Sequence, residues 1–225
     1  AEPVAVFLSL CLPRNGAESI AAEIYEAVCE GCEKYSVAIG GGDTNVWDGP
    51  LVVHMTAIGR ARENGCWLRS GAKPGDRLVV SGKLGGSLLG KHLDFQPRLE
   101  LARELYKLGV VNAATDISDG LGVDLLNLTV ASRCGAEVDL DAIPISDAAI
   151  ERSKLSQAAA LEHALGDGED FELLLAVDSN RLGELPREVA GIPLTQIGTF
   201  VSRTGLWARN KRGLVQLPAR GYVHS

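Results

Sequence analysis

The sequence predicts an α/β (α+β) protein. Short apolar runs rich in β-branched residues recur along the chain, and amphipathic segments with helical spacing lie between them. Glycine- and proline-containing turn signals separate the two kinds of segment. The 225 residues are enough for one large domain or two modest ones. A basic connector that ends in a Pro-Gly turn suggests a boundary near Gly71.

Composition and charge exclude several classes of protein. A hydrophobic content of 46% and a charged content of 23% are typical of globular proteins. The net charge of −7 argues against a nucleic-acid partner, because phosphate backbones require clustered Lys and Arg side chains. No apolar run approaches the roughly 20 residues that cross a bilayer, so no membrane partner is expected. The five cysteines lack the spacing of a disulfide scaffold, which favours the cytoplasm.

The first third of the chain combines strands with a glycine run. Residues 4–12 are expected to form a strand and residues 17–35 a helix. A short strand over 37–39 runs into three glycines that end at Gly42, followed by Asp43. Such glycines can let main-chain N–H groups bind phosphate, with Asp43 holding a metal. A flexible turn after the strand is the alternative.

The next segments are expected to form a strand over 77–81 and a helix over 98–109, separated by a second glycine-rich stretch. This stretch, GKLGGSLLG, resembles a phosphate loop only superficially. Its Lys83 precedes the glycine pair, whereas the phosphate-binding motif places Lys after the glycines. Close packing of the main chain is therefore the favoured explanation of these glycines.

A pair of carboxylates precedes the next helix, in the sequence DISDG. Asp116 and Asp119 are three residues apart, and leucines with helical spacing follow Gly120. Ser118 or Asp119 could cap the helix N-terminus. The same oxygen-rich cluster could instead bind Mg²⁺. The local sequence leaves both explanations open.

Three further acids lie in a glycine-containing turn before the apolar strand of GEDFELL. Asp167, Glu169 and Asp170 could serve only to solvate a loop. A carboxylate at this position could also bind a cationic group of a substrate.

The order of these motifs resembles one enzyme family. GGDT, RSGAKPGD, DISDG, GEDFELL, IGTF and a GY pair near the end follow one another as in the thiamine-monophosphate kinase family. That family belongs to a superfamily of ATP-binding proteins that includes aminoimidazole ribonucleotide synthetase. The purine synthetases have a TGGG-like sequence in place of SDG. The hydrogenase-maturation relative has TRGG there and ends in a reactive Cys, whereas this chain ends in YVHS.

The resemblance implies a two-domain fold like that of aminoimidazole ribonucleotide synthetase, with mixed sheets backed by helices. Residues 1–71 would form a partial N-terminal domain for ATP binding and dimerisation, and residues 72–225 a C-terminal domain. It also implies roles for particular residues: Asp43, Asp116 and Asp119 as catalytic Mg²⁺ ligands, Gly42, Asp43, Arg69 and Ser118 as ATP contacts, and Glu169 and Tyr222 as contacts of the thiamine part.

The reaction implied by the resemblance transfers the ATP γ-phosphoryl group to thiamine monophosphate in a homodimer. The acceptor phosphate has a second pKa of about 6, so at neutral pH no side chain has to remove a proton from it. Mg²⁺ and Arg69 would screen the repulsion between the two polyanions.

The chain by itself is expected to have low activity, and two alternative functions are open. The family's first segment is missing before Ala1, so we expect a part of a longer protein that by itself binds nucleotide weakly and turns over little. Transfer to another small phosphate within the superfamily is one alternative function. A non-catalytic nucleotide-binding module is the other.

Overall fold

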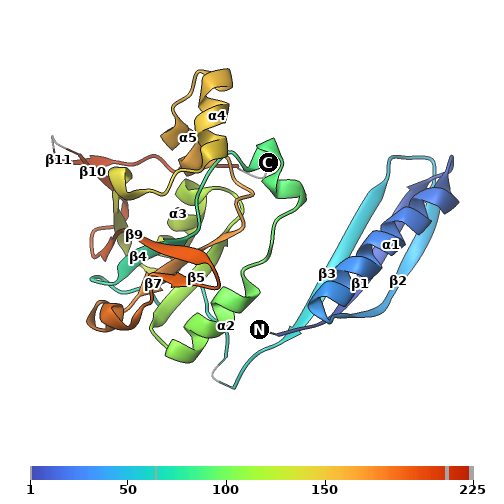
Figure 1. Ribbon diagram of the computed structural model, residues 1–225, viewed down its shortest axis with the longest axis horizontal. Coiled ribbons are helices and arrows are strands. Elements are labelled where there is room, and N and C mark those ends of the chain that lie inside the picture. Colours follow the sequence, from blue (N-terminus) through green and yellow to red (C-terminus); the bar gives the residue numbers. More distant parts are fainter. Residues whose placement is uncertain (1, 64, 211–212, 223–225) are drawn as a thin grey trace. The chain divides into compact units, whose positions relative to one another are not determined.

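The computed structural model describes residues 2–63, 65–210 and 213–222. The chain forms two compact units, Ala1–Cys66 and Trp67–Ser225, which are described separately (Figure 1). Among the described helices, none has the length and apolar character needed to cross a membrane.

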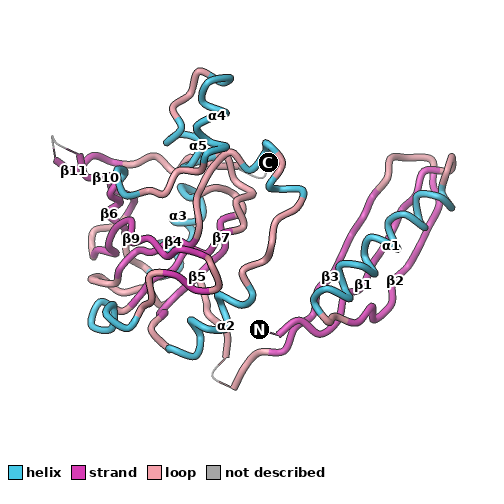
Figure 2. The backbone as a smooth tube through the Cα atoms, viewed as in Figure 1, coloured by secondary structure: helices cyan, strands magenta, loops and turns pink. Residues whose placement is uncertain are grey.

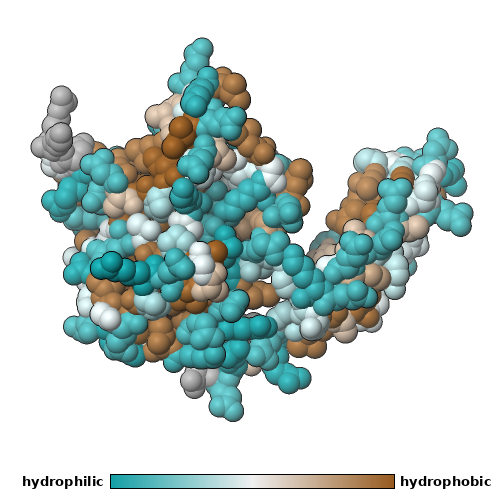
Figure 3. Space-filling view, in the orientation of Figure 1, coloured by the Kyte–Doolittle hydropathy of each residue, from teal (hydrophilic) through white to brown (hydrophobic). Residues whose placement is uncertain are grey.

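The N-terminal unit is a three-stranded mixed sheet with one helix. Its elements are β1 (Glu2–Pro13), α1 (Ala17–Tyr35), β2 (Ala38–Trp47) and β3 (Val52–Arg60). The strand order is β2-β1-β3, with β1 parallel to β2 and antiparallel to β3. The core is small: Leu8, Leu10 and Leu12 of β1 pack against the apolar side of α1. Many apolar side chains of β3 are exposed, including Val53 and Met55, and brown patches are visible on this unit in Figure 3.

The first glycine run lies inside β2, so the alternative of a flexible turn after the strand is wrong. The register of β1 against β2 shifts between Val6 and Phe7, which pair with Ile39 and Gly41, so Gly40 is the extra residue of a β-bulge in β2. A Cβ atom on Gly42 would lie 1.8 Å from the Leu8 carbonyl oxygen, and one on Gly40 would lie 2.7 Å from the Phe7 ring. The glycines therefore permit close strand packing at the point where the chain approaches Asp43.

The C-terminal unit is built around an eight-stranded mixed sheet (Figure 2). Its strands are β4 (Arg77–Ser81), β5 (Val111–Ile117), β6 (Gly135–Asp139), β7 (Glu172–Val177), β8 (Glu188–Val189), β9 (Ile192–Val201), β10 (Gly205–Asn210) and β11 (Gly213–Gln216). Its helices are η1 (Ser87–Leu89), η2 (Lys91–Leu93), α2 (Leu99–Leu108), α3 (Leu121–Ser132), η3 (Leu140–Ala142), α4 (Asp147–Ser156), α5 (Ala160–Gly166) and η4 (Ser179–Glu184). The strand order is β11-β10-β6-β9-β4-β7-β5, and β8 pairs with β9.

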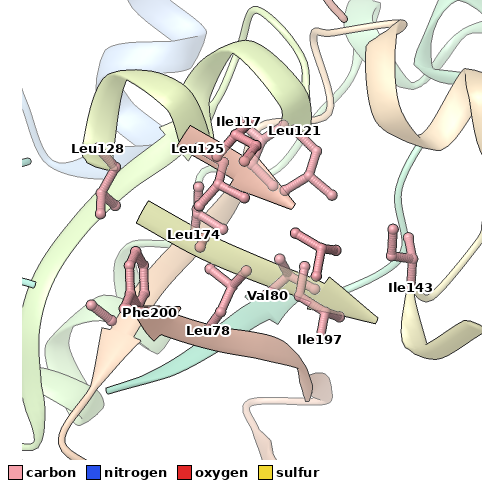
Figure 4. Close-up of a cluster of buried hydrophobic side chains, with 14 of the residues drawn as sticks. Leu78, Val80, Ile117, Leu121, Leu125, Leu128, Ile143, Leu174, Ile197 and Phe200 are labelled. Carbon is pink, nitrogen blue, oxygen red and sulfur yellow. The ribbon is translucent and has the colours of Figure 1, made fainter. Parts of the chain in front are cut away.

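Apolar side chains cover both faces of this sheet, because successive residues of a strand point to opposite faces. Leu121, Leu125 and Leu128 of α3 are buried on one face, and Figure 4 shows their side chains pointing towards the strands. Leu101 and Leu105 of α2 are buried in a second cluster that contains the alternate residues of β4 and β7. The helix predicted over 98–109 is thus confirmed, with its end at the left-handed Gly109.

Candidate active site

The DISDG turn (residues 116–120) connects β5 to α3 at the end of the sheet. Ile117 is fully buried, whereas Asp116 is exposed and Asp119 is half-buried. Gly120 has φ 111°, and a Cβ atom there would lie 3.2 Å from the Gly166 Cα atom and 3.3 Å from the Gly221 Cα atom. Glycine is therefore required for the turn to pack this closely against two other segments.

A buried carboxylate that follows the turn holds its main chain. The Oδ2 atom of Asp124 accepts hydrogen bonds from the N–H groups of Ser118 and Asp119, each at 3.0 Å. The N-cap residue of α3 is Gly120, without a side-chain cap bond. The alternative that Ser118 or Asp119 caps α3 is therefore wrong. Their N–H groups bind Asp124 instead, which leaves both residues at the surface of the turn.

The DISDG turn concentrates negative charge. Burial raises the pKa of Asp124 to about 6, and the charges of Asp119 and Asp116 add to this, while the two N–H groups oppose it. Asp116 and Asp119 therefore lie close enough to act on one buried carboxylate. Carboxylate oxygens suit Mg²⁺, which commonly binds one or two carboxylates together with phosphate oxygens and water. In the described part of the chain, no three His, Cys, Asp or Glu side chains form a metal-binding group by themselves.

Arg69 lies beside the same end of β5. Its Nε atom donates to Thr115 Oγ1 at 3.1 Å, and that oxygen lies 3.5 Å from Asp116 Oδ1. The main chain before it is fixed by a bond from the Ala114 N–H to the Leu68 carbonyl. Thr115 thus links the guanidinium group of Arg69 to the carboxylate of Asp116, a combination suited to binding a phosphate and its counter-ion.

Two distant segments bind to the main chain of the DISDG turn. In the acidic loop (residues 167–171), the N–H of Glu169 donates to the Ser118 carbonyl at 2.7 Å. In the segment over 217–222, the N–H of Tyr222 donates to the Asp119 carbonyl at 2.8 Å. These bonds bring the expected site residues Ser118, Asp119, Glu169 and Tyr222 together.

The acidic loop uses most of its carboxylates internally. The N–H of Gly85 donates to both oxygens of Asp170 at 2.9 and 3.1 Å, and the N–H of Gly86 donates to Asp167 at 3.0 Å. The second glycine-rich stretch therefore binds carboxylates of its own chain. Its expected close packing is confirmed, because a Cβ atom on Gly85 would lie 2.6 Å from the main chain of α5.

Glu169 differs from its acidic neighbours. Its side chain is exposed, and among the described residues it has no hydrogen-bond or ion-pair partner. Tyr222 is 63% exposed. A carboxylate and an aromatic ring are thus displayed next to the DISDG turn, where they could bind a cationic aromatic group.

Gly42 and Asp43 lie on β2 of the N-terminal unit. Asp43 is exposed, and its Oδ2 atom accepts a hydrogen bond from Asn45 at 2.8 Å. Both residues line a cavity of about 620 Å³ together with Leu8, Tyr25 and Ile39. Main-chain groups and one carboxylate therefore border an open space in this unit.

Sequence reasoning missed the residues that support the site. Asp124 was not identified from the sequence, because it lies within an apolar helix. A single acid among the leucines of that helix could nevertheless have indicated a buried role. Glu172 is likewise buried, and it begins a strand that otherwise reads as purely apolar. These two acids are identified by what they bind inside the fold.

Comparisons with known proteins show which protein family the chain resembles. Residues 1–61 match the N-terminal domain of AIR synthase related proteins, and residues 73–207 match their C-terminal domain. The chain is 46% identical over its whole length to a thiamine-monophosphate kinase of Rhodopirellula baltica and covers 71% of that relative.

Solved structures share the fold. AaThiL, complexed with AMPPCP and TMP, has a TM-score of 0.83 and 24% identity, with 99% of this chain and 74% of that chain covered. The hydrogenase maturation protein HypE of E. coli has a TM-score of 0.80 at 23% identity, with 97% of this chain and 74% of that chain covered. Both likenesses show the fold alone. The identity to the Rhodopirellula relative and the AIR synthase related domains together show that this chain belongs to the thiamine-monophosphate kinase family.

Proposed function

We propose that this chain converts thiamine monophosphate to thiamine diphosphate by direct transfer of the γ-phosphoryl group of ATP. Family membership supports the reaction, and AaThiL has been solved with AMPPCP and TMP. The observation that carries the proposal is the DISDG turn, to which the segments of Glu169 and Tyr222 bind through their main chains. Phosphate-binding and thiamine-binding side chains would then lie on one framework.

In this proposal the acids act on the phosphates. Asp116 and Asp119 would hold Mg²⁺ at the DISDG turn, and Asp43 would hold Mg²⁺ at the glycine run of β2. Bound Mg²⁺ would neutralise phosphate charge. Arg69 and Ser118 would bind phosphate oxygens of ATP, as would the N–H groups near Gly42. No general base is needed, because the acceptor phosphate is already ionised at neutral pH.

The thiamine part would bind through Glu169 and Tyr222. The thiazolium ring is cationic and aromatic, so an exposed carboxylate and an aromatic face complement it. The support for this assignment is that Glu169 is the acid of its loop whose side chain remains available. We place the reaction in the cytoplasm and propose a homodimer, which light scattering would test.

The proposed function is tested by a coupled assay of ADP release with thiamine monophosphate and ATP. Asp119→Asn should reduce kcat by at least 100-fold while the circular dichroism spectrum is retained. The matched control is Asp141→Asn, because Asp141 is an exposed acid that lies in η3, outside the proposed site. Near-normal turnover in Asp119→Asn would contradict the metal assignment. Activity with other phosphate acceptors but not with thiamine monophosphate would contradict the substrate.

A further inference from the structure

The acidic loop has an unusual main-chain conformation. Glu169 has φ 54° and Phe171 has φ 51°, both in the left-handed region, although neither residue is glycine. Such a conformation is unfavourable for residues other than glycine and persists only where surrounding contacts impose it. The contacts that impose it here therefore also set the direction in which Glu169 points.

The DISDG turn holds one side of the loop. The N–H groups of Glu169 and Phe171 donate to the carbonyls of Ser118 and Ile117 at 2.7 and 2.8 Å. These two bonds fix the distance between the loop and the turn. The antiparallel pairing of β5 with β7 continues directly after them, with Ile117 opposite Glu172.

The segment over residues 91–98 holds the end of the loop that enters β7. Glu172 is buried, and Arg98 donates two hydrogen bonds to its carboxylate at 2.8 and 2.6 Å. Lys91 and Ser81 donate to the same carboxylate at 2.9 and 2.7 Å. A bidentate Arg–carboxylate pair fixes orientation as well as distance.

An aromatic contact joins the same two segments. The rings of Phe95 and Phe171 are stacked, with centroids 3.9 Å apart and planes at 22°. The stack holds the side chain of Phe171, a left-handed residue that lies between Glu169 and Glu172. The ion pair thus holds Glu172 and the ring stack holds Phe171, two adjacent residues of the main chain that leads away from Glu169.

We propose that Arg98 and Phe95 are positioning residues for thiamine binding. Arg98 acts through Glu172 and Phe95 acts through Phe171, and together they keep Glu169 in the conformation that receives the thiazolium group. The inference rests on the proposed function. It adds that a segment distant in the sequence influences the affinity for the substrate. Arg98 precedes Glu169 by 71 residues.

The test compares two affinities in Arg98→Gln and Phe95→Leu. Calorimetry with thiamine monophosphate should show a dissociation constant raised at least fivefold. With AMPPCP the constant should stay within twofold, because Arg69 and Ser118 are not held by this segment. Arg103→Gln is the matched control, since Arg103 is an exposed arginine of the neighbouring α2. Phe95→Tyr keeps the ring and should restore affinity for thiamine monophosphate.

Hydrogen exchange gives a readout that does not depend on any ligand. The N–H groups of Glu169 and Phe171 should exchange at least tenfold faster in Arg98→Gln and Phe95→Leu, while those of α3 remain unchanged. Unchanged exchange and unchanged affinity in either folded variant would overturn the inference, as would equal weakening of both ligands. If the wild-type chain binds no thiamine monophosphate, the proposed function fails, and the exchange result still decides whether the two residues hold the loop. Should Arg98→Gln not fold, Phe95→Leu carries the same test.

Discussion

Asp124 and Asp170 are buried carboxylates that bind main-chain N–H groups instead of cations. Asp124 fixes the DISDG turn, and Asp170 fixes the acidic loop against Gly85. Burial raises the pKa of Asp170 to about 7, the charges of Glu172 and Asp167 add to this, and the Gly85 N–H and Lys91 oppose it. Both acids therefore fix main-chain segments whose other side chains lie at the surface.

The raised pKa of Asp170 predicts a pH-dependent stability. The folded protein keeps this proton up to about pH 7, whereas the unfolded chain loses it near the ordinary Asp pKa of 3.8. Folding therefore binds a proton between these two values, and the free energy of unfolding falls as the pH rises through this window. Asp170→Asn should remove this pH dependence of the free energy of unfolding, which amounts to a change on the order of 4 kcal/mol over the whole window.

Urea unfolding at a series of pH values between 4 and 7 checks this prediction. The comparison is between the slopes of the wild type, Asp170→Asn and the control Asp141→Asn. Since Asp141 is exposed, its replacement should leave the slope unchanged. An Asp170→Asn slope equal to that of the wild type would show that this carboxyl group does not carry the effect.

At the scale of the elements, α3 is both a core helix and a support for the site. Its leucines anchor it to the sheet, while Gly122 in its first turn faces the segment that leads to Tyr222. A Cβ atom on Gly122 would lie 2.5 Å from the carbonyl oxygen of Arg220 and 2.6 Å from the main-chain nitrogen of the same residue. Helix propensity thus favours alanine at this position, whereas packing against Arg220 favours glycine.

Gly122→Ala should therefore displace the 217–222 segment, although alanine favours the helix by about 1 kcal/mol. We expect at least a fivefold rise in KM for thiamine monophosphate, with little change in KM for ATP. Gly31→Ala in α1 is the matched control, because a Cβ atom there would meet nothing within 4 Å. That control should raise the free energy of unfolding by about 0.5–1 kcal/mol and leave kinetics unchanged. Equal KM values in Gly122→Ala and the wild type would contradict the packing argument.

Sequence patterns predicted the elements where the hydrophobic period was strong. The leucines of α3, the amphipathic α1 and the glycine end of α2 are all observed as expected. The pattern failed where main-chain packing decides the structure, as at Gly42, whose strand looked like a turn. The same applies before the helix start at Gly120, where the N–H groups of Ser118 and Asp119 bind the Asp124 carboxylate and neither side chain caps the helix. Contacts between distant segments, such as Arg98 with Glu172, leave no local signal.

At the scale of the whole molecule, the residues assigned to metal binding are separate from the cores that stabilise the two units. Asp43, Asp116 and Asp119 are exposed or half-buried, whereas each core consists of apolar side chains. Chelation with EDTA should therefore abolish ADP release without changing the far-ultraviolet circular dichroism spectrum, and added Mg²⁺ should restore turnover. Loss of secondary structure on chelation would indicate a structural ion instead.

The segments of the proposed site are joined at the DISDG turn by peptide N–H and carbonyl groups, at Ser118, Asp119, Glu169 and Tyr222. Such bonds do not involve the side chain, provided that the residue is not proline and, at position 169, that it tolerates the left-handed φ of 54°. Positions 169 and 222 can consequently be diversified in a library while the scaffold around the phosphate-binding acids is retained. This makes the chain a suitable starting point for directed evolution towards other phosphorylated acceptors.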